Sequence, residues 1–251
     1  NFRNPTRFME KLQVYKLVFR NPIMHTFADK AAAKELVGKI IGKEYIVPLI
    51  GVYDRFENIP REKLPNQFVI KANHGSGFTI ICRDKASFDW DRAANEANGW
   101  LGYDFFGRFW EWCYFGIKPK LVVEELLLDE NGKIPPDCKI HVTDGKVCEV
   151  QYIFDRFDGN QSTVHMTPQW ERLNFSINVL PHTAPFDRPP QTDLMMELAE
   201  KLGRGFPFVR VDFMLCKGRV YFAEMTFYPS GGFGVITPPE WDEILGERVA
   251  L

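Results

Sequence analysis

The chain has 251 residues, 45% of them hydrophobic, and a formal net charge of −2. This length buries a full core as one large domain or two small ones, and the balanced charge gives no indication of an extended nucleic-acid-binding surface. No apolar run approaches the roughly 20 residues that span a bilayer, and Asn1 does not begin a signal peptide. Five scattered cysteines without a CxxC pair and five dispersed histidines predict reduced thiols in the cytosol and no zinc site.

Two helices and three strands are predicted in the first third of the chain. Apolar positions at near-helical spacing predict a helix within residues 5–20, and Asp29 is a suitable N-cap for a second helix over residues 30–42. Segments rich in β-branched and aromatic residues, bounded by turn residues, predict short strands at 45–48, 67–71 and 78–83.

Residues 87–115 form a predicted helical region that is rich in aromatic side chains. Such a stripe either packs in the core beneath a lid or offers a surface on which bases stack, and core packing is the favoured interpretation. Its tryptophans and tyrosines are Trp90, Trp100, Tyr103, Trp110, Trp112 and Tyr114.

The rest of the chain mixes strands and helices without strict alternation. Strands are predicted at 121–128, 139–143 and 147–154, before a Pro-rich loop to residue 190 and a helix at 192–202. Two apolar runs, FVRVDFML and RVYFAEMTF, flank a polar turn at 216–218 and predict a β-hairpin. The predicted fold class is therefore α+β rather than a doubly wound parallel sheet.

The predicted hairpin carries one carboxylate in each apolar strand. Antiparallel pairing about Gly218 would set Asp212 and Glu224 close together, and two such carboxylates repel unless a cation compensates them. Mg²⁺ prefers oxygen ligands and typically takes one or two protein carboxylates plus substrate phosphates. Arg210 and a glycine-rich PSGG turn on the same segment favour this metal site over the alternative, an exposed acidic residue on each strand.

A lysine and a small-residue loop predict a phosphate site. Lys71 ends an apolar strand, and the loop at 73–77 follows it with Gly75 and Gly77. Glycines let backbone N–H groups approach a phosphate while the lysine supplies charge. The loop lacks the GKS/T of a Walker A motif, and its His74 suits a loop hydrogen bond at least as well as catalysis.

Two further strands place polar groups on one face. Asp137, Lys139 and His141 alternate at period two, so they line either a cleft or an ordinary solvated face. Glu124 and Glu125 follow one another in an apolar strand. One of them must point inward, and that glutamate is expected to have a specific partner.

Taken in order, these motifs resemble the ATP-grasp superfamily. Asp29-Lys30 with its helix and Pro48 is similar to the superfamily's entry motif, VIKANHGSG to its phosphate-binding lid, and RVD followed by E-x-T to its metal hairpin. The closer resemblance is to the TupA-like ATP-grasp family, named for teichuronopeptide biosynthesis. It includes NPTRFMEKLQ, the N-H-G-S-G loop, the D-x-K strand and the final E-x-T-F-x-P-x-G-G-F stretch, and it spans essentially the whole chain.

The resemblance implies an ATP-grasp fold with two α+β subdomains that clasp ATP and a small N-terminal segment. The implied boundaries are 1–65 for the N-terminal subdomain, 66–125 for the ATP lid and 126–251 for the metal and substrate subdomain. The implied nucleotide-binding residues are Lys30 and Lys71 on the phosphates, the loop residues His74, Gly75, Ser76 and Gly77 over them, Glu124, Glu125 and Leu127 around adenine and ribose, and Asp137 near the ribose.

The resemblance also implies a reaction centre. Asp212 and Glu224 would hold Mg²⁺ with Thr226, which replaces the Asn common in the wider superfamily. Arg210 and Lys139 would be catalytic and offset negative charge. Residues of the acceptor site would be Tyr228, Ser230 and Gly231. The helix after Lys30 lacks the aromatic residue and arginine of many relatives, and Lys34 replaces them only in part.

The implied activity is that of an ADP-forming carboxylate–amine ligase with ATP and Mg²⁺ as cofactors. Its substrates would be a small amino compound and a carboxylated sugar or glycan, in the cytoplasm near the inner membrane face where bacterial surface glycans are assembled. No nucleic-acid partner is expected. Three alternatives are an ATP-grasp kinase, a glycosyltransferase of the same pathways, which would need a DxD-type motif that this chain lacks, and a non-catalytic glycan-binding protein.

Overall fold

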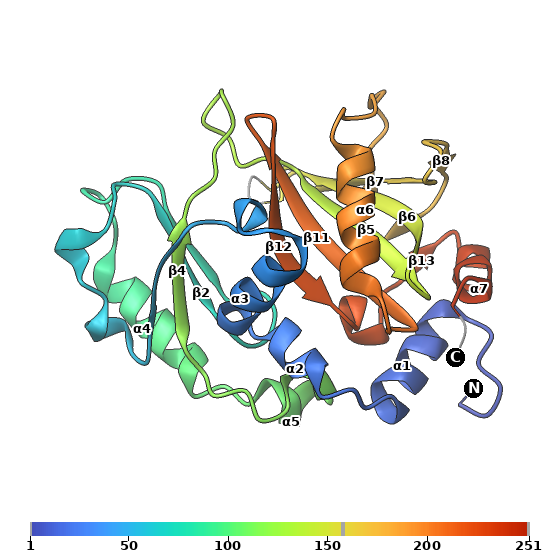
Figure 1. The fold of residues 1–251 in the computed structure, drawn as a ribbon, viewed down its shortest axis with the longest axis horizontal. Coiled ribbons are helices and arrows are strands. Elements are labelled where there is room, and N and C mark those ends of the chain that lie inside the picture. Colours follow the sequence, from blue (N-terminus) through green and yellow to red (C-terminus); the bar gives the residue numbers. More distant parts are fainter. Residues whose placement is uncertain (1, 157–158, 250–251) are drawn as a thin grey trace.

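The computed structural model describes residues 2–156 and 159–249. Its helices and strands form two lobes, each with its own buried apolar core (Figure 1). Both lobes combine antiparallel strands with helices. The predicted α+β class is thereby confirmed.

The smaller lobe is a four-stranded antiparallel sheet in the order β1-β4-β2-β3. Helix α4 (Trp90–Leu101) packs on it, and its Trp100 joins the core of this lobe. The short helix α5 (Phe105–Phe109) follows at the bottom of Figure 1. The strands are β1 (Leu49–Tyr53), β2 (Phe68–Ala72), β3 (Thr79–Cys82) and β4 (Leu121–Glu125).

The larger lobe is a seven-stranded sheet in the order β10-β7-β6-β5-β11-β12, with β8 paired to β7. Helix α6 (Thr192–Gly203) packs against β5, β6 and β11. A separate small ladder joins β9 (Ser176–Ile177) to β13 (Ile236–Thr237). The main strands are β5 (Asp137–Thr143), β6 (Lys146–Phe154), β7 (Ser162–Met166), β8 (Arg172–Leu173), β10 (Leu180–Pro181), β11 (Phe208–Cys216) and β12 (Arg219–Thr226).

The N-terminal helices pack mainly with the larger lobe. Helix α1 (Phe8–Val18) lies against α7 (Glu240–Glu247), and α3 (Lys30–Ile41) lies against α6. The short α2 (Ile23–Ala28) connects them, and Figure 1 shows α3 between the two lobes. Residues 1–65 thus contribute helices to the larger core and strand β1 to the smaller sheet.

Five 3₁₀ turns complete the described elements. They are η1 (Lys43–Tyr45), η2 (Phe56–Asn58), η3 (Arg61–Lys63), η4 (Trp112–Tyr114) and η5 (Pro229–Gly232).

Three sequence predictions about elements were wrong. The segment 45–48 is not a strand, because Pro48 cannot donate to a ladder and β1 starts after it. Strand β4 ends at Glu125 rather than at residue 128. The Pro-rich loop before residue 190 contains β7 to β10, and β8, β9 and β10 have two residues each, too few to show the alternation of a strand.

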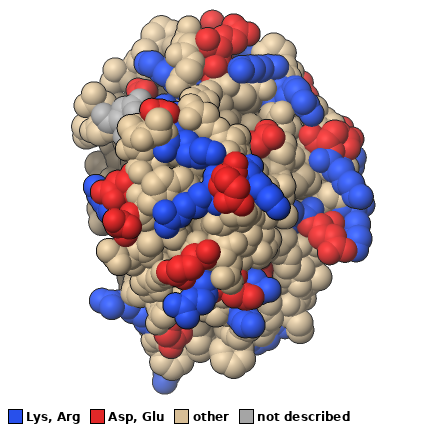
Figure 2. All heavy atoms as spheres, turned by 90° about the vertical axis from the view of Figure 1, so that its left-hand side faces the viewer, with Lys and Arg blue, Asp and Glu red and all other residues tan. Residues whose placement is uncertain are grey.

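The surface of the smaller lobe carries charges of both signs. Figure 2 shows basic and acidic side chains interspersed on this face rather than gathered into one field. Within residues 2–156 and 159–249, no helix combines the length and apolar composition needed to cross a bilayer.

Candidate active site

The hairpin β11–β12 brings its two carboxylates side by side. Its turn at Lys217 and Gly218 has positive φ at both residues (50° and 73°), the geometry that tight hairpins favour. The register shifts by one residue between Phe213 and Asp212, and after this shift Asp212 lies directly opposite Glu224. The predicted hairpin and the predicted proximity are therefore confirmed, whereas the alternative of two exposed acids is wrong, because Asp212 is only 2% exposed.

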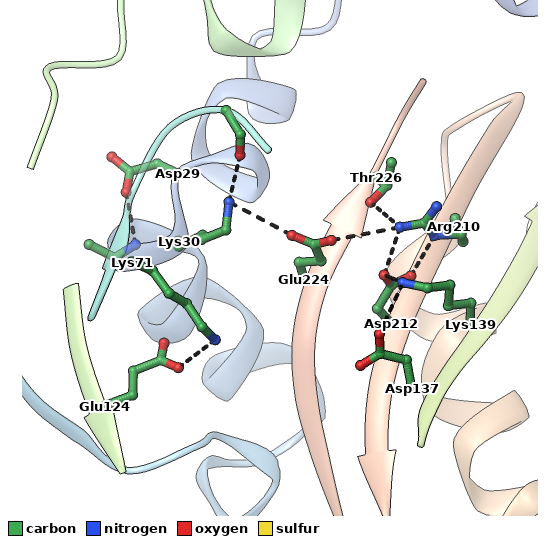
Figure 3. Close-up of polar contacts among 12 residues, drawn as sticks. Asp29, Lys30, Lys71, Glu124, Asp137, Lys139, Arg210, Asp212, Glu224 and Thr226 are labelled. Carbon is green, nitrogen blue, oxygen red and sulfur yellow. Dashed lines mark hydrogen bonds and ion pairs between the residues drawn. The ribbon is translucent and has the colours of Figure 1, made fainter. Parts of the chain in front are cut away.

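Asp212 is held by two cations (Figure 3). Arg210 donates from Nε to Oδ1 at 2.6 Å and from Nη2 to Oδ2 at 2.7 Å, and Lys139 donates to Oδ2 at 2.5 Å. Burial raises the pKa of Asp212, but the charges of Arg210 and Lys139 more than offset it and hold the pKa well below its ordinary value. The carboxylate is therefore ionised and fixed in place at neutral pH.

Glu224 is more loosely held and partly exposed. Its oxygens lie 3.7 Å from the Lys30 ammonium and 3.6 Å from Nη2 of Arg210. Burial raises its pKa, but the charges of Lys30, Lys139 and Arg210 more than offset this effect, so the net shift is downward. Thr226 accepts a hydrogen bond from Arg210 at 3.0 Å. Glu224 is thus the carboxylate here with the most room for a new ligand.

The hairpin fits a divalent cation that takes most of its ligands from a substrate. In the described part of the chain, no group of three His, Cys, Asp or Glu side chains is arranged to hold a metal. A pair of adjacent carboxylates, Asp212 and Glu224, is what Mg²⁺ uses when phosphates supply the other oxygens. The assignment of Asp212, Glu224 and Thr226 as metal ligands stays a prediction.

Asp29 and Lys30 tie helix α3 to the loop at 73–77. Asp29 caps the helix by accepting from the amides of Ala31 and Ala32, as predicted, and it also accepts from the Asn73 side chain at 3.0 Å. Lys30 donates from its backbone to Asn73 and from Nζ to the Gly75 carbonyl at 2.8 Å. Lys30 therefore contacts both the loop and, through Glu224, the hairpin of the other lobe.

The loop itself has a buried and an exposed half. The buried His74 ring lies 3.3 Å from the Asn73 amide oxygen and 3.2 Å from the Tyr103 carbonyl, so both nitrogens have protein partners. Burial and the nearby Lys30 charge lower its pKa. Ser76 and Gly77 are exposed. This arrangement anchors the loop at His74 and leaves its tip open to a ligand.

Glu124 is the inward-facing glutamate and has two lysine partners. Its oxygens lie 2.8 Å from Nζ of Lys71 and 3.0 Å from Nζ of Lys34. Burial raises its pKa, but the two ammonium groups bring it down to about 2. Glu125 is exposed, and Leu127 packs at the edge of a small apolar cluster with Val47, Cys216 and Tyr221. The expectation of one specifically paired glutamate is confirmed.

The three alternating residues of β5 border the hairpin rather than bulk solvent. Lys139 pairs across the strands with Asp212, and Asp137 accepts from Arg156 at 2.7 Å. His141 is buried with Nδ1 3.7 Å from Glu149, and burial lowers its pKa. The alternative of a solvated face is therefore wrong.

Both lobes contribute to one cavity of about 930 Å³. Ser76 lines it from the loop, and Lys139, Arg210 and Glu224 line it from the larger sheet. The predicted acceptor residues Tyr228, Ser230 and Gly231 lie in the same wall. Of the aromatic segment, Trp90 and Trp100 pack in the core of the smaller lobe, and Tyr103, Trp110 and Tyr114 line this cavity.

The sequence did not identify Arg156 and Glu111 as residues of the site, and it did not indicate the partner of Lys34. Lys34 was named only as a partial replacement for residues of relatives, and its position one helical turn after Lys30 was the signal that it lies on the same side of the helix. Arg156 follows the end of β6, where nothing in the sequence distinguishes it from a solvated arginine. Glu111 lies in the aromatic segment and lines the cavity. The sequence interpretation of this segment considered only its tryptophans and tyrosines.

Comparison with known proteins agrees with this geometry. Residues 10–250 match the family described as TupA-like ATPgrasp. No curated protein matches the chain significantly in sequence. The ADP complex of N5-carboxyaminoimidazole ribonucleotide synthetase superposes with a TM-score of 0.50 at 15% identity, over 88% of this chain and 51% of that one.

Phosphoribosylamine–glycine ligase from Thermotoga maritima superposes equally well, with a TM-score of 0.50 at 16% identity, over 85% of this chain and 52% of that one. The chain thus spans about half the length of these two structures. At this identity they show a shared fold, and the family match covers nearly the entire sequence. The chain belongs to the TupA-like ATP-grasp family.

Proposed function

We propose that this protein is an ADP-forming carboxylate–amine ligase that joins an amino compound to a carboxylated sugar or glycan precursor. The observation that carries the proposal is the carboxylate pair of the β11–β12 hairpin, set among Arg210, Lys139 and Lys30. Glu224, Arg210 and Lys139 line a cavity that Ser76 of the glycine-containing loop also lines. Such an array suits phosphoryl transfer, in which positioning and cations supply most of the catalysis.

The reaction has two steps. A carboxylate oxygen of the acid attacks the γ-phosphorus of ATP, the bond to the β–γ bridging oxygen breaks, and ADP leaves. The amine nitrogen then attacks the acyl carbon, the bond to the phosphate oxygen breaks, and phosphate leaves as the nitrogen gives up a proton. Neither step needs a nucleophile from the protein.

Different residues of the site would bind the phosphates, hold the metal ion and compensate charge. Lys30 and Lys71 would bind the phosphates, beneath the exposed loop tip at Ser76 and Gly77. Mg²⁺ bound at Asp212 and Glu224 would neutralise phosphate charge. Arg210, which lines the cavity, would compensate the charge that develops on the acyl oxygen.

The choice of substrates follows the family. Because the TupA-like family is named for a bacterial surface polymer, we propose a uronic acid or a glycan bearing one as the acid. ATP supply places the reaction in the cytoplasm, and the five cysteines, all free thiols, are compatible with a reducing compartment. Assembly of surface glycans would bring the enzyme close to the inner membrane face.

Trapping of the acyl phosphate tests the reaction. The protein is incubated with ATP, Mg²⁺, hydroxylamine and a panel of uronic acids and amino acids, and ADP and hydroxamate are measured. We expect ADP release to rise with the correct acid and an equal amount of hydroxamate to form, because hydroxylamine attacks acyl phosphates readily. The Glu224→Gln protein is the inactive control.

The alternatives give different products. A kinase would release ADP with a stable phosphorylated acceptor and no hydroxamate. A glycosyltransferase would consume a nucleotide sugar and ignore ATP. Either result would overturn the ligase proposal without changing the family assignment.

A further inference from the structure

Glu111 is a buried carboxylate in the wall of the cavity. It follows Trp110, whose φ of 56° ends helix α5, and it is the first residue before the 3₁₀ turn η4. Its side chain is only 9% exposed, and the residue lines the same cavity as Arg210 and Glu224.

The carboxylate of Glu111 has no protein donor. Throughout residues 2–156 and 159–249, no hydrogen bond or ion pair reaches its oxygens, although the cavity gives them some access. The other buried carboxylates of the site, such as Glu124 and Asp212, each have two cationic partners. A buried carboxylate without a partner is costly, so Glu111 fits a site whose partner arrives with a ligand.

The nearest cation does not fill this role. Lys16 is within electrostatic range of Glu111, but its ammonium donates to the Gly231 carbonyl at 2.8 Å and lies over the Phe233 ring at 4.9 Å. A Cβ built on Gly231 would lie 3.4 Å from Glu111 Oε1. Glu111 therefore adjoins the PSGG turn, the proposed acceptor site.

The cavity wall near Glu111 carries aromatic side chains. Tyr114 is partly buried and within electrostatic range of both Glu111 and Glu224. Trp110 and Phe233 line the cavity as well. A carboxylate beside aromatic rings can bind an ammonium group, because the carboxylate attracts its charge and the rings add cation–π attraction.

We propose that Glu111 binds the amino substrate as its ammonium ion and accepts the proton that the nitrogen must lose before it attacks. This proposal rests on the ligase function above and assigns the amine to the end of the cavity between α1, η4 and the PSGG turn. In the step, one N–H bond of the ammonium breaks and its proton passes to a Glu111 oxygen. The freed lone pair forms the bond to the acyl carbon, the bond from that carbon to the phosphate oxygen breaks, and the leaving phosphate takes the second proton of the nitrogen.

The proton affinity of Glu111 suits this task. Burial raises its pKa from 4.5, and although the Lys16 charge opposes the effect, the value reaches about 7. A carboxylate with a pKa near the working pH is both deprotonated often enough to act and basic enough to accept a proton.

Carbon-13 NMR of protein labelled at the Glu side-chain carboxyl carbon tests the binding site without ATP or acid. The Glu111 signal is assigned by its loss in Glu111→Gln, and the probe is propylammonium chloride, with sodium chloride and 1-propanol as controls. We expect a saturable shift of the Glu111 signal and a lower apparent pKa with propylammonium alone. The Glu124 signal is the internal control and should not move, because two lysines already occupy its oxygens. An unchanged Glu111 signal, or an equal shift with sodium chloride, would overturn the proposal.

A second experiment tests the proton transfer with the acid that yields hydroxamate. Hydroxylamine is largely unprotonated at neutral pH, whereas an aliphatic amine must first lose a proton. In Glu111→Gln we expect the ratio of amide to hydroxamate to fall by about a hundredfold at pH 7, with the loss reduced at high pH. An unchanged ratio would contradict the role of Glu111 as proton acceptor. If wild type forms no hydroxamate, the ligase proposal fails, and the NMR experiment still decides the ammonium site.

Discussion

Buried carboxylates in this chain differ in how their charge is balanced. Glu124 lies between two lysines, and Asp212 between Arg210 and Lys139. Glu149 accepts from His165 at 2.6 Å. In the proposed function, phosphates of ATP would compete for the lysines and Mg²⁺ would compete for the carboxylates, so these ion pairs would hold the site in shape while leaving its charges available.

Removal of either hairpin carboxylate should abolish turnover. Asp212→Asn also leaves Arg210 and Lys139 buried without their anion, and breaking a buried pair in this way costs about 3–5 kcal/mol of stability. Glu224→Gln touches a looser, partly exposed group and should leave stability close to wild type. ADP release with Mg²⁺ and urea unfolding measure the two effects. Near-wild-type ADP release by Glu224→Gln at low Mg²⁺ would contradict the metal assignment.

Loss of the phosphate lysines should weaken ATP binding. Lys30→Ala and Lys71→Ala each remove one positive charge from the loop side of the site, and calorimetric titration with ATP should show a lower affinity for both. Lys39→Ala is the matched control. Lys39 lies on helix α3, as Lys30 does, but it is exposed and pairs with Glu35. Equal affinities for Lys30→Ala, Lys71→Ala and Lys39→Ala would remove the first two residues from the phosphate site.

The raised pKa of Glu111 predicts a pH-dependent stability. The folded protein holds the proton more tightly than the unfolded chain, so stability falls as the pH rises from 4.5 through about 7. At roughly 1.4 kcal/mol per pKa unit, the ionised carboxylate costs the folded protein about 3 kcal/mol at pH 8. We therefore expect urea unfolding to show that the stability of Glu111→Gln, relative to that of wild type, is higher at pH 8 than at pH 5. A constant difference between the two proteins would show that Glu111 is not desolvated.

At the level of elements, the hairpin was the most predictable part of the chain. Its apolar runs are long and its turn residues are specific. A regular count from the turn at 217–218 would set Asp212 opposite Ala223, and an irregularity of register between Asp212 and Phe213, which the sequence did not indicate, sets it opposite Glu224. Strands β7 to β10 were missed because pairing with strands distant in sequence, rather than their own sequences, defines them. The role of Glu111 was missed for the same reason, since neighbours distant in sequence bury it.

The loop at 73–77 offers two glycines with opposite surroundings. Both have positive φ, 76° at Gly75 and 81° at Gly77. A Cβ on Gly75 would lie 2.5 Å from the Phe105 ring, whereas one on Gly77 meets nothing within 4 Å. Gly75→Ala should therefore lower ATP affinity and stability more than Gly77→Ala, which carries the backbone strain alone. Calorimetry and thermal unfolding of the two variants measure the difference, and equal losses would show that contact with Phe105 does not position the loop.

At the scale of the whole molecule, Lys30 contacts residues of both lobes. It begins helix α3, donates to the loop of the smaller lobe and lies 3.7 Å from Glu224 of the larger lobe. Figure 3 shows its ammonium between these two contacts. A ligand that draws Lys30 toward phosphate therefore changes both contacts at once.

Hydrogen exchange tests this coupling. With saturating Mg-ATP, amides of the loop at 73–77 and of the edge strand β12 should both gain protection, because in the proposed function the nucleotide would cover the exposed tip of the loop and Mg²⁺ would order the carboxylates of the hairpin. In Lys30→Ala, at an ATP concentration that still saturates the site, the loop should keep part of its protection while β12 loses most of its own. Lys39→Ala again serves as control and should follow wild type. If β12 is protected equally in Lys30→Ala and wild type, the two lobes respond to ATP independently, and the bridge from loop to hairpin through Lys30 has no part in closure.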